Sequence, residues 1–476
     1  MARREPSMDK RTAIPREWSV GACALLLALA GCNFAPLYQR PKADLKPTWS
    51  TEAAPSAPQQ DIPWESIYTD ERLRVLIRTA QSNNHDVRLA VSRMEEARAQ
   101  WGVQRADQMP GVNASLGRIG SLTPAGVANT AVPFHINRFD ANLNLLSFEL
   151  DFWGRVANLT EAARLNFVAS SEDQRVIRLS LISDVANAYF AWLESEQRAD
   201  LLARTVQTRE QHLSLTQRRR DLGAASDLDV NMAQGSLASA QSDAAAMQRQ
   251  LELARHALTL LVGGRMPADL PAGAALQSQN LTLQWGANLS SEVLLRRPDV
   301  RAAEQRLMAA NANIGVARAA FLPRMQLTGS VGSASTGLGG LFKSGSSEWS
   351  FTPNLQQPLF DGGRNARTVD LAEARKVQGV VQYEKTLQQA FREVADLLVA
   401  RDTLQQQQAS LETWSRSQQE RLRLTEARYA NGAANQLELL DAQRDALTAQ
   451  QTQVQMLRQL LGTTAQLYKA LGGGDR

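Results

Sequence analysis

Apolar and polar residues alternate in four short stretches of the chain, and this period of two predicts β-strands. The stretches lie at about 111–121, 139–152, 325–334 and 348–359. From Phe139 to Leu145 the alternation keeps one phase, and from Leu146 it slips by one residue, which predicts a β-bulge or a sharp kink. Loops rich in Gly, Ser, Thr and Pro separate the members of each pair. We therefore expect two pairs of strands.

Longer stretches carry apolar residues at helical spacing, such as Leu179, Ile182 and Ala186. Two of them contain no proline and little glycine, and at ~1.5 Å per residue each would form a helix ~100 Å long. Helices of this length must pack lengthwise, in coiled-coil fashion. The expected helices lie at about 84–109, 155–220, 227–262, 298–322, 364–430 and 436–471.

The chain also repeats itself. A segment that begins at Asn83 aligns without a gap with one that begins at Arg296, and Gly223-Ala224-Ala225 matches Gly432-Ala433-Ala434. The repeated unit, of about 210 residues, is far longer than the unit of solenoid repeats. The expected parts are a signal peptide (1–31), an N-terminal segment with a first short helix (32–82), a first repeat (83–262), an inter-repeat linker (263–297), a second repeat (298–471) and a tail (472–476).

The N-terminus reads as an export signal, because Lys10, Arg11 and Arg16 precede an apolar run that is short for a membrane helix. The run ends in Leu29-Ala30-Gly31-Cys32, which resembles the bacterial lipobox. This resemblance implies cleavage before Cys32, lipidation of Cys32 and, because Asn33 rather than Asp follows, residence in the outer membrane. The alternative is an ordinary signal in which the cysteine occurs by chance.

Composition argues against two classes of function, nucleic-acid binding and membrane spanning by helices. The formal net charge is +4, and no basic cluster is interleaved with aromatic residues, so nucleic acid is not an expected partner. After residue 32 we see no apolar run near the ~20 residues of a membrane helix, so a chain that spans a membrane would do so with strands. Four strands cannot close a barrel. Either they form a sheet in water, or several chains pool them, and three chains would supply twelve.

The lipobox, the duplication, "PLFDGGR" (358–364) and "RYANGAANQLELLDAQR" (428–444) together resemble the outer-membrane efflux factor family, the TolC-like exit ducts. The resemblance implies a mainly α-helical homotrimer whose twelve-stranded transmembrane β-barrel stands on an α-helical tunnel. It implies docking to a periplasmic adaptor protein and an inner-membrane transporter, of resistance-nodulation-division type, for passive efflux of small molecules such as drugs. The alternatives are a duct for type I protein secretion and a periplasmic coiled-coil lipoprotein that forms no channel.

The sequence shows no catalytic or metal-binding constellation, since its four histidines are scattered, and no cofactor is expected. The resemblance places the two helical turns at the periplasmic tip of the duct. It thereby nominates Asp441 as a lumenal carboxylate of the gate, with latch groups and adaptor-docking positions around it. The latch candidates are Arg428, Tyr429 and Arg444, and the docking candidates are Gly223, Ala224, Gly432 and Ala433.

Each nomination has a simpler alternative. Asp441 and Arg444 are three residues apart and can form an ordinary surface ion pair on one helix. The two glycines can serve only to end their helices. Trp349, Phe351 and Phe139 fit an aromatic girdle of a barrel, and they fit packing between strands equally well.

Overall fold

The computed structural model describes residues 33–42, 46–49, 62–126, 132–279, 281 and 289–474. The signal peptide and Cys32 therefore lie outside the described residues. The chain divides into two compact units, which we describe separately. The first unit comprises 1–40, 97–167 and 305–380, and the second comprises 41–96, 168–304 and 381–476.

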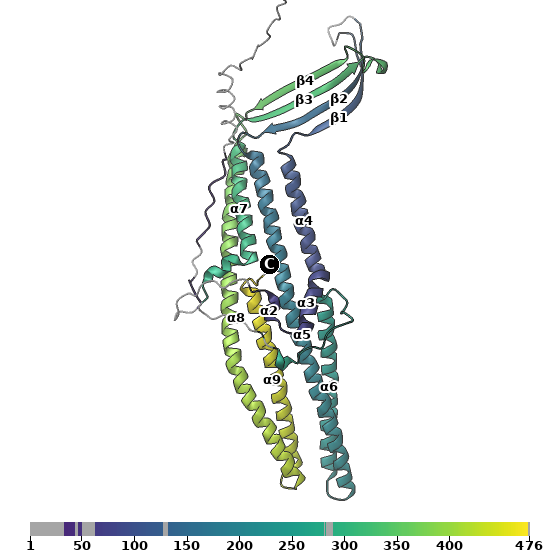
Figure 1. Ribbon diagram of the computed structural model, residues 1–476, viewed down its shortest axis with the longest axis vertical. Helices are drawn as coiled ribbons and strands as arrows, with labels where there is room; N and C mark the ends of the chain where they lie inside the picture. Colours follow the sequence, from purple (N-terminus) through teal and green to yellow (C-terminus); the bar gives the residue numbers. More distant parts are fainter. Residues whose placement is uncertain are drawn as a thin grey trace, which may run out of the picture. The chain divides into compact units, whose positions relative to one another are not determined.

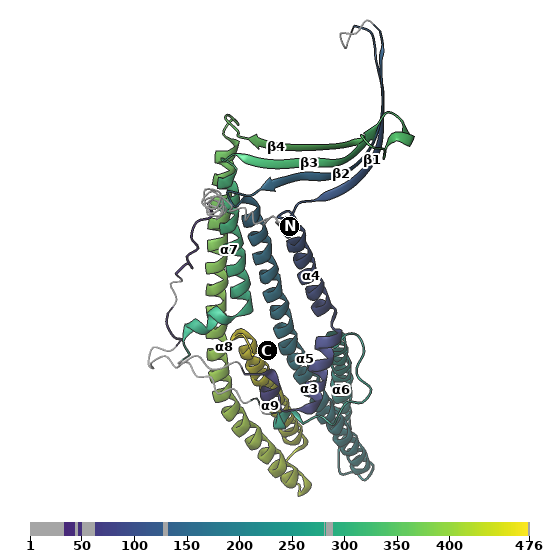
Figure 2. The ribbon, with the colours of Figure 1, turned by 45° about the horizontal axis from the view of Figure 1, so that its top comes forward.

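The first unit contains an antiparallel sheet of four strands in the order β1-β2-β3-β4 (Figure 1). The strands are β1 (Val112–Thr123), β2 (Phe134–Leu150), β3 (Arg324–Ser335) and β4 (Ser347–Gln356). Figure 2 shows that the β1–β2 hairpin continues past the β3–β4 turn. The register agrees, because the last residue of β3, Ser335, pairs with Phe139, five residues into β2.

The expected phase slip in β2 is confirmed, since the pairing with β3 shifts register between Leu145 and Phe148. Two strand limits differ from the prediction by three residues or more. β2 begins at Phe134 rather than 139, because the β1–β2 hairpin continues its pairing to Thr123 and Phe134, beyond Phe139 where the clear alternation starts. β4 ends at Gln356 rather than 359, because Pro358 lacks the N–H that a further ladder bond needs.

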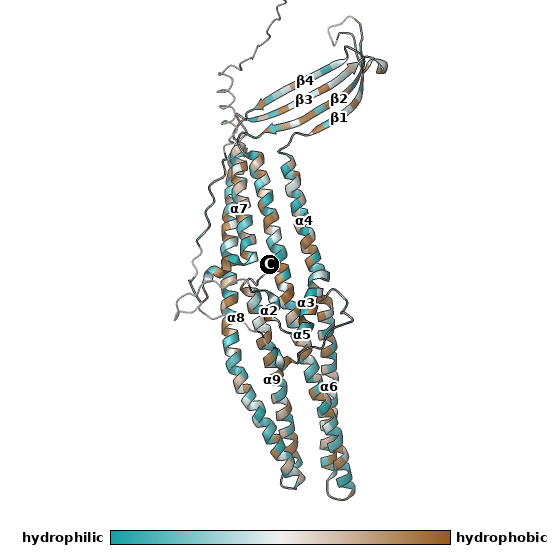
Figure 3. Ribbon diagram, in the orientation of Figure 1, coloured by the Kyte–Doolittle hydropathy of each residue, from teal (hydrophilic) through white to brown (hydrophobic). Residues whose placement is uncertain are grey.

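Apolar and polar residues alternate along the strands (Figure 3), and the register places most of the apolar ones on one face. Leu143 pairs with Ala114 on one side and with Val331 on the other, and Val331 pairs with Trp349. On the opposite face, Ser330 and Ser350 are hydrogen-bonded at 2.7 Å. Between the bulge and Phe139, the two faces therefore run across all four strands.

The helices of the two repeats have matching lengths. α4 (His85–Ala106) and α7 (Pro298–Ala319) have 22 residues each, α5 (Arg155–Asp221) and α8 (Arg364–Ala430) have 67, and α6 (Asp227–Leu261) and α9 (Gln436–Ala470) have 35. α4 and α7 end three residues before the limits we predicted, because the last residues ahead of each proline form turns in which Met109 N and Leu322 N donate to carbonyls three residues back.

In the first unit, small residues bring the helices close together. Ala162 and Leu165 of α5 pack against Ala309 and Ala312 of α7. A Cβ on Gly315 of α7 would stand 2.7 Å from the backbone nitrogen of Ala35, so the N-terminal segment lies directly on that helix. This contact fixes the segment around Ala35 against α7.

The second unit holds the rest of the long helices with α2 (Trp64–Ile67), α3 (Glu71–Asn83) and the linker between the repeats. The single short helix expected before residue 83 is thus two helices. The linker carries the 3₁₀ turns η1 (Leu276–Ser278) and η2 (Ser291–Arg296) and is tied to the N-terminal segment by the bridges Thr48–Ser290 and Tyr68–Leu281. Fully buried Tyr189, Tyr383 and Leu294 belong to its core.

One expectation about membrane helices needs correction. α5 contains an 18-residue stretch that is long and apolar enough to match a membrane helix, although none was expected after residue 32. Half of that stretch is buried inside the chain. Because α5 also buries Val185, Ala186 and Phe190 completely, packing within the second unit accounts for its apolar character.

Candidate functional site

The turns that close the two long hairpins have the same backbone geometry, and both belong to the second unit. Gly223 and Gly432 each have a φ of +73°, which glycine adopts without strain. Ala224 N donates to the carbonyl of Arg219 at 2.7 Å, and Ala433 N donates to the carbonyl of Arg428 at 2.8 Å. These bonds form a Schellman motif, which satisfies carbonyls at each helix end.

A cap starts the return helix of each hairpin. The Ser226 side chain accepts from Asp229 N at 3.1 Å, and the Asp229 carboxylate accepts from Ser226 N at 2.9 Å. These backbone and side-chain bonds to Ser226 lower the pKa of Asp229. In the second hairpin, the Asn435 side chain accepts from Glu438 N at 2.8 Å. Turn glycine and cap together make each tip a short, well-defined loop.

Tyr429 connects the two hairpins. Its hydroxyl accepts a hydrogen bond from Nη1 of Arg219 at 3.4 Å, and the Arg219 guanidinium carbon lies 5.6 Å from the ring centroid. The ring of His212 lies on the same phenol ring, with 5.8 Å between centroids. The sequence nominated Tyr429, but it did not identify either partner on α5.

Two basic side chains with buried nitrogen atoms, one of them only half-buried as a whole, line this part of α5. Arg209 is 7% exposed, and its Nη1 has no hydrogen-bond partner among the described residues. Nε2 of His212 is likewise buried and unpartnered there. Burial lowers the pKa of Arg209. Burial, and then the charges of Arg209 and Arg219, lower the pKa of His212.

The other nominated side chains form contacts within their own hairpin. Nη2 of Arg428 donates to the Ala433 carbonyl at 2.9 Å, and its Nη1 lies 3.6 Å from the Glu438 carboxylate. Arg444 lies 3.1 Å from Asp441 on the same helix. The structure therefore contains the simple surface pair that was the alternative for Asp441 and Arg444.

Two further links near the tips were not foreseen. Arg421 of α8 binds Asp445 of α9 at 2.8 Å, and this bond, with the weaker one from Arg444, lowers the pKa of Asp445. Nε2 of Gln436 donates to the Asp229 carbonyl at 3.0 Å and joins the second hairpin to the first. Arg421 and Asp445 each lie on an amphipathic helix, but the sequence does not show which helix faces meet.

The sheet of the first unit has two edges without a partner in the described chain, because β1 pairs only with β2 and β4 only with β3. Large apolar side chains on its apolar face are exposed, including Leu116, Trp349 and Phe351. Unpaired edges and an exposed apolar face indicate that other strands and an apolar environment complete this sheet.

The residue after Cys32 is held firmly. The side-chain oxygen of Asn33 accepts from Ala35 N at 2.9 Å and from Nδ2 of Asn158 at 3.0 Å. Nδ2 of Asn311 donates to the Pro36 carbonyl at 2.6 Å. These contacts tie the start of the described chain to α5 and α7 within the first unit.

Comparisons with known proteins agree with this geometry. The family model for outer membrane efflux protein matches residues 76–264 and 289–473. Outer membrane protein OprJ of Pseudomonas aeruginosa is 40% identical over 96% of this chain and 97% of its own length. Cation efflux system protein CusC of Escherichia coli K12 is 37% identical over 94% of this chain and 97% of its own.

A solved structure is equally similar. The open state of the MtrE outer membrane channel of Neisseria gonorrhoeae superimposes with a TM-score of 0.85 at 37% identity, and the match covers 93% of this chain and 98% of that one. Both sequence and fold are therefore shared over nearly the whole length of these proteins.

Proposed function

This chain belongs to the outer membrane efflux protein family, and from that premise we propose how its parts divide the work of the channel. The protein is an efflux channel of the outer membrane of a Gram-negative bacterium. The family is one of ducts rather than enzymes. We propose that this chain does no chemistry and uses no energy, so that solutes pass through it passively.

The observation that carries the proposal is the two-faced sheet with two open edges. In a bilayer every backbone N–H and C=O needs a partner, so an open edge is excluded. If β4 of each copy pairs with β1 of the next, three copies close a barrel of twelve strands with the apolar face toward lipid.

The hairpin turns are the proposed periplasmic tip. Gly223, Ala224, Gly432 and Ala433 are exposed at the ends of their hairpins and offer small, uncharged surfaces to the hairpins of an adaptor protein. The adaptor would in turn connect the channel to an inner-membrane transporter of the resistance-nodulation-division type.

The proposed latch is the contact of Tyr429 with Arg219, because it is a side-chain link between the two hairpins of one copy. Asp441 and its two symmetry copies are the proposed lumenal ring. Arg444 and Arg428 support it through their ion pairs with Asp441 and Glu438. Three carboxylates around a narrow aperture repel one another and attract cations.

We propose that Cys32 carries lipid and anchors the chain. The contacts of Asn33 and Pro36 support this, because they fix the neighbouring chain against α5 and α7. For the cargo we propose small molecules, including drugs.

The assembly is tested by native mass spectrometry of the detergent-solubilised protein. A trimer with heat-modifiable, detergent-resistant strand content is expected. A stable monomer would contradict barrel closure and favour a periplasmic lipoprotein that forms no channel.

The tip is tested by photo-crosslinking in living cells from position 433. Capture of an adaptor together with a resistance-nodulation-division pump is the expected result. Ala409, an exposed alanine ~36 Å along α8, serves as the control position and should capture no adaptor at comparable yield. Capture with an ATP-driven secretion transporter would move the function to protein export, and equal capture at both positions would remove the tip as docking site.

A further inference from the structure

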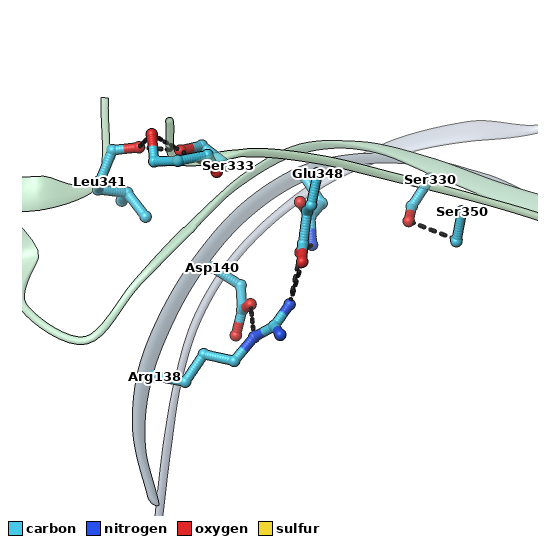
Figure 4. Close-up of polar contacts among 9 residues, drawn as sticks. Arg138, Asp140, Ser330, Ser333, Leu341, Glu348 and Ser350 are labelled. Carbon is cyan, nitrogen blue, oxygen red and sulfur yellow. Dashed lines mark hydrogen bonds and ion pairs between the residues drawn. The ribbon is translucent and has the colours of Figure 1, made fainter. Parts of the chain in front are cut away.

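A charged cluster lies on the polar face of the sheet, near the hairpin end of the strands. Arg138 of β2 forms ion pairs with Asp140 on the same strand and with Glu348 of β4. Figure 4 shows the Arg138 guanidinium between the two carboxylates. The cluster joins strands that are not neighbours, since β3 runs between them.

Gly332 of β3 makes this arrangement possible. It pairs with Asn142 on one side and with Glu348 on the other, and a Cβ there would stand 2.0 Å from Oδ1 of Asn142. With no side chain between them, Nδ2 of Asn142 reaches Oε1 of Glu348 at 3.5 Å. The glycine thus opens a gap that polar groups from both flanking strands fill.

The nearest side chains on the polar face toward the helices are uncharged, and Glu149, further along that face, is paired with Arg155. Toward the helices, the next side chains on this face include Asn144, Ser330, Ser350 and Thr352. One arginine and two carboxylates leave the cluster with a net charge of about −1 per chain at neutral pH. Fixed charges that line a narrow passage change the local concentration of mobile ions.

We propose that Arg138, Asp140 and Glu348 form a charge filter at the outer mouth of the channel, which favours cationic over anionic solutes. The inference rests on the proposed function, because three copies form a ring only if the barrel closes with its polar face inward. Arg138 sets the strength of the filter, since it neutralises one of the two carboxylates.

The matched control is Arg118. It lies on β1 and pairs with Phe139, the residue that follows Arg138 on β2. Its side chain is on the apolar face, where its guanidinium carbon stands 5.4 Å from the Phe139 ring. Arg118→Gln therefore removes the same charge at nearly the same height without changing the polar face. Arg138→Lys keeps the charge of the cluster.

The test is single-channel conductance of the full-length trimer in a planar bilayer, with hexaamminecobalt(III) added on the loop side as a trivalent blocking cation. Arg138→Gln should tighten block roughly three- to tenfold at ~0.1 M salt, and Glu348→Gln should weaken it by a similar factor. Both effects should shrink at ~1 M salt. Arg118→Gln and Arg138→Lys should block like the unmodified protein.

The outcomes separate the two levels of inference. If the unmodified trimer conducts and both glutamine variants at the cluster block within twofold of it, the cluster only holds strands together and the filter is refuted. If Arg138→Gln forms no trimer, Glu348→Gln decides alone, because its expected shift has the opposite sign. If the unmodified protein forms no conducting trimer, the proposed function fails and the filter falls with it.

Discussion

Replacing Asp70 by asparagine should loosen the junction between the N-terminal segment and the inter-repeat linker. The Asp70 carboxylate is buried and accepts four hydrogen bonds. Oδ1 accepts from Arg72 N at 2.9 Å, where Asp70 caps α3. Oδ2 accepts from the Tyr189 hydroxyl at 2.7 Å, from Nε2 of Gln279 at 2.6 Å and from Ala274 N at 3.2 Å. Burial and the Asp70 carboxylate raise the pKa of Tyr189, so its hydroxyl keeps the proton that it donates.

The expected magnitude follows from the geometry of the amide that Asp70→Asn introduces. If the amide oxygen takes the place of Oδ2, the NH₂ group faces the N–H of Arg72 and one charge-assisted bond is lost. If the oxygen takes the place of Oδ1, the NH₂ group faces three donors. The smaller loss is about 1.5–3 kcal/mol, which corresponds to a factor of ~10 to ~150 in local opening. Tyr189→Phe should cost less, because Oδ2 keeps two donors.

The assay is amide hydrogen exchange of the folded trimer in detergent, followed at Ala274. Protection there should fall at least ~10-fold in Asp70→Asn. Ser290→Ala is the control on the same linker, since among the described residues the Ser290 hydroxyl accepts one long bond, of 3.3 Å, from Glu292 N at an exposed site. A change below threefold in Asp70→Asn, or an equal change in Ser290→Ala, would refute the assignment of Asp70 as the tie between the two segments.

Three further predictions concern the tip and the sheet. Burial and two neighbouring guanidinium groups hold the pKa of His212 below its ordinary value of 6.5. Because the unfolded chain therefore binds the proton more readily than the folded chain, the packing at Tyr429 should weaken as the pH falls below ~6.5. Hydrogen exchange at the tip should rise from pH 7.5 to pH 5.5, and His212→Asn should flatten that rise. Gly432→Ala should cost about 1 kcal/mol in thermal or denaturant stability of the tip, because its φ is +73° and a Cβ there meets no atom within 4 Å; no change in stability would contradict the left-handed turn. Gly332→Ala should abolish the heat-resistant trimer on SDS gels, because the Cβ would also stand 2.2 Å from the Ala141 carbonyl, whereas Gly117→Ala, with open space around its Cβ, should retain it.

The helices and strands could be predicted from the sequence because each rests on a local pattern. The period of two and its phase slip located β2 and its bulge, and proline marked the ends of α4 and α7. The start of β2 at Phe134 was missed, since pairing across the hairpin extends a strand beyond its alternation. The apolar stretch of α5 was underestimated for a similar reason: its burial is a property of the helices packed around it.

The contacts between helices at the tips could not be predicted in this way. Periodicity shows which side of a helix is apolar, but it does not fix how two helices rotate against each other. Tyr429 was therefore nominated without its partner Arg219, and Asp445, which binds an arginine on the facing helix, was not nominated. The aligned repeats held one signal, because Arg219 occupies the position in the first hairpin that Arg428 occupies in the second.

Comparison of the two repeats distinguishes the residues that form the hairpin turns from the residues that make contacts between helices. Positions that shape the turn match between repeats: Gly223 corresponds to Gly432, and Ser226 to the equivalent cap Asn435. Positions that make contacts across helices differ. His212 beneath Tyr429 corresponds to Arg421, which instead binds the carboxylate of Asp445. Two hairpins of one fold therefore carry different side-chain links, so changes in pH or ionic strength should act unequally on them.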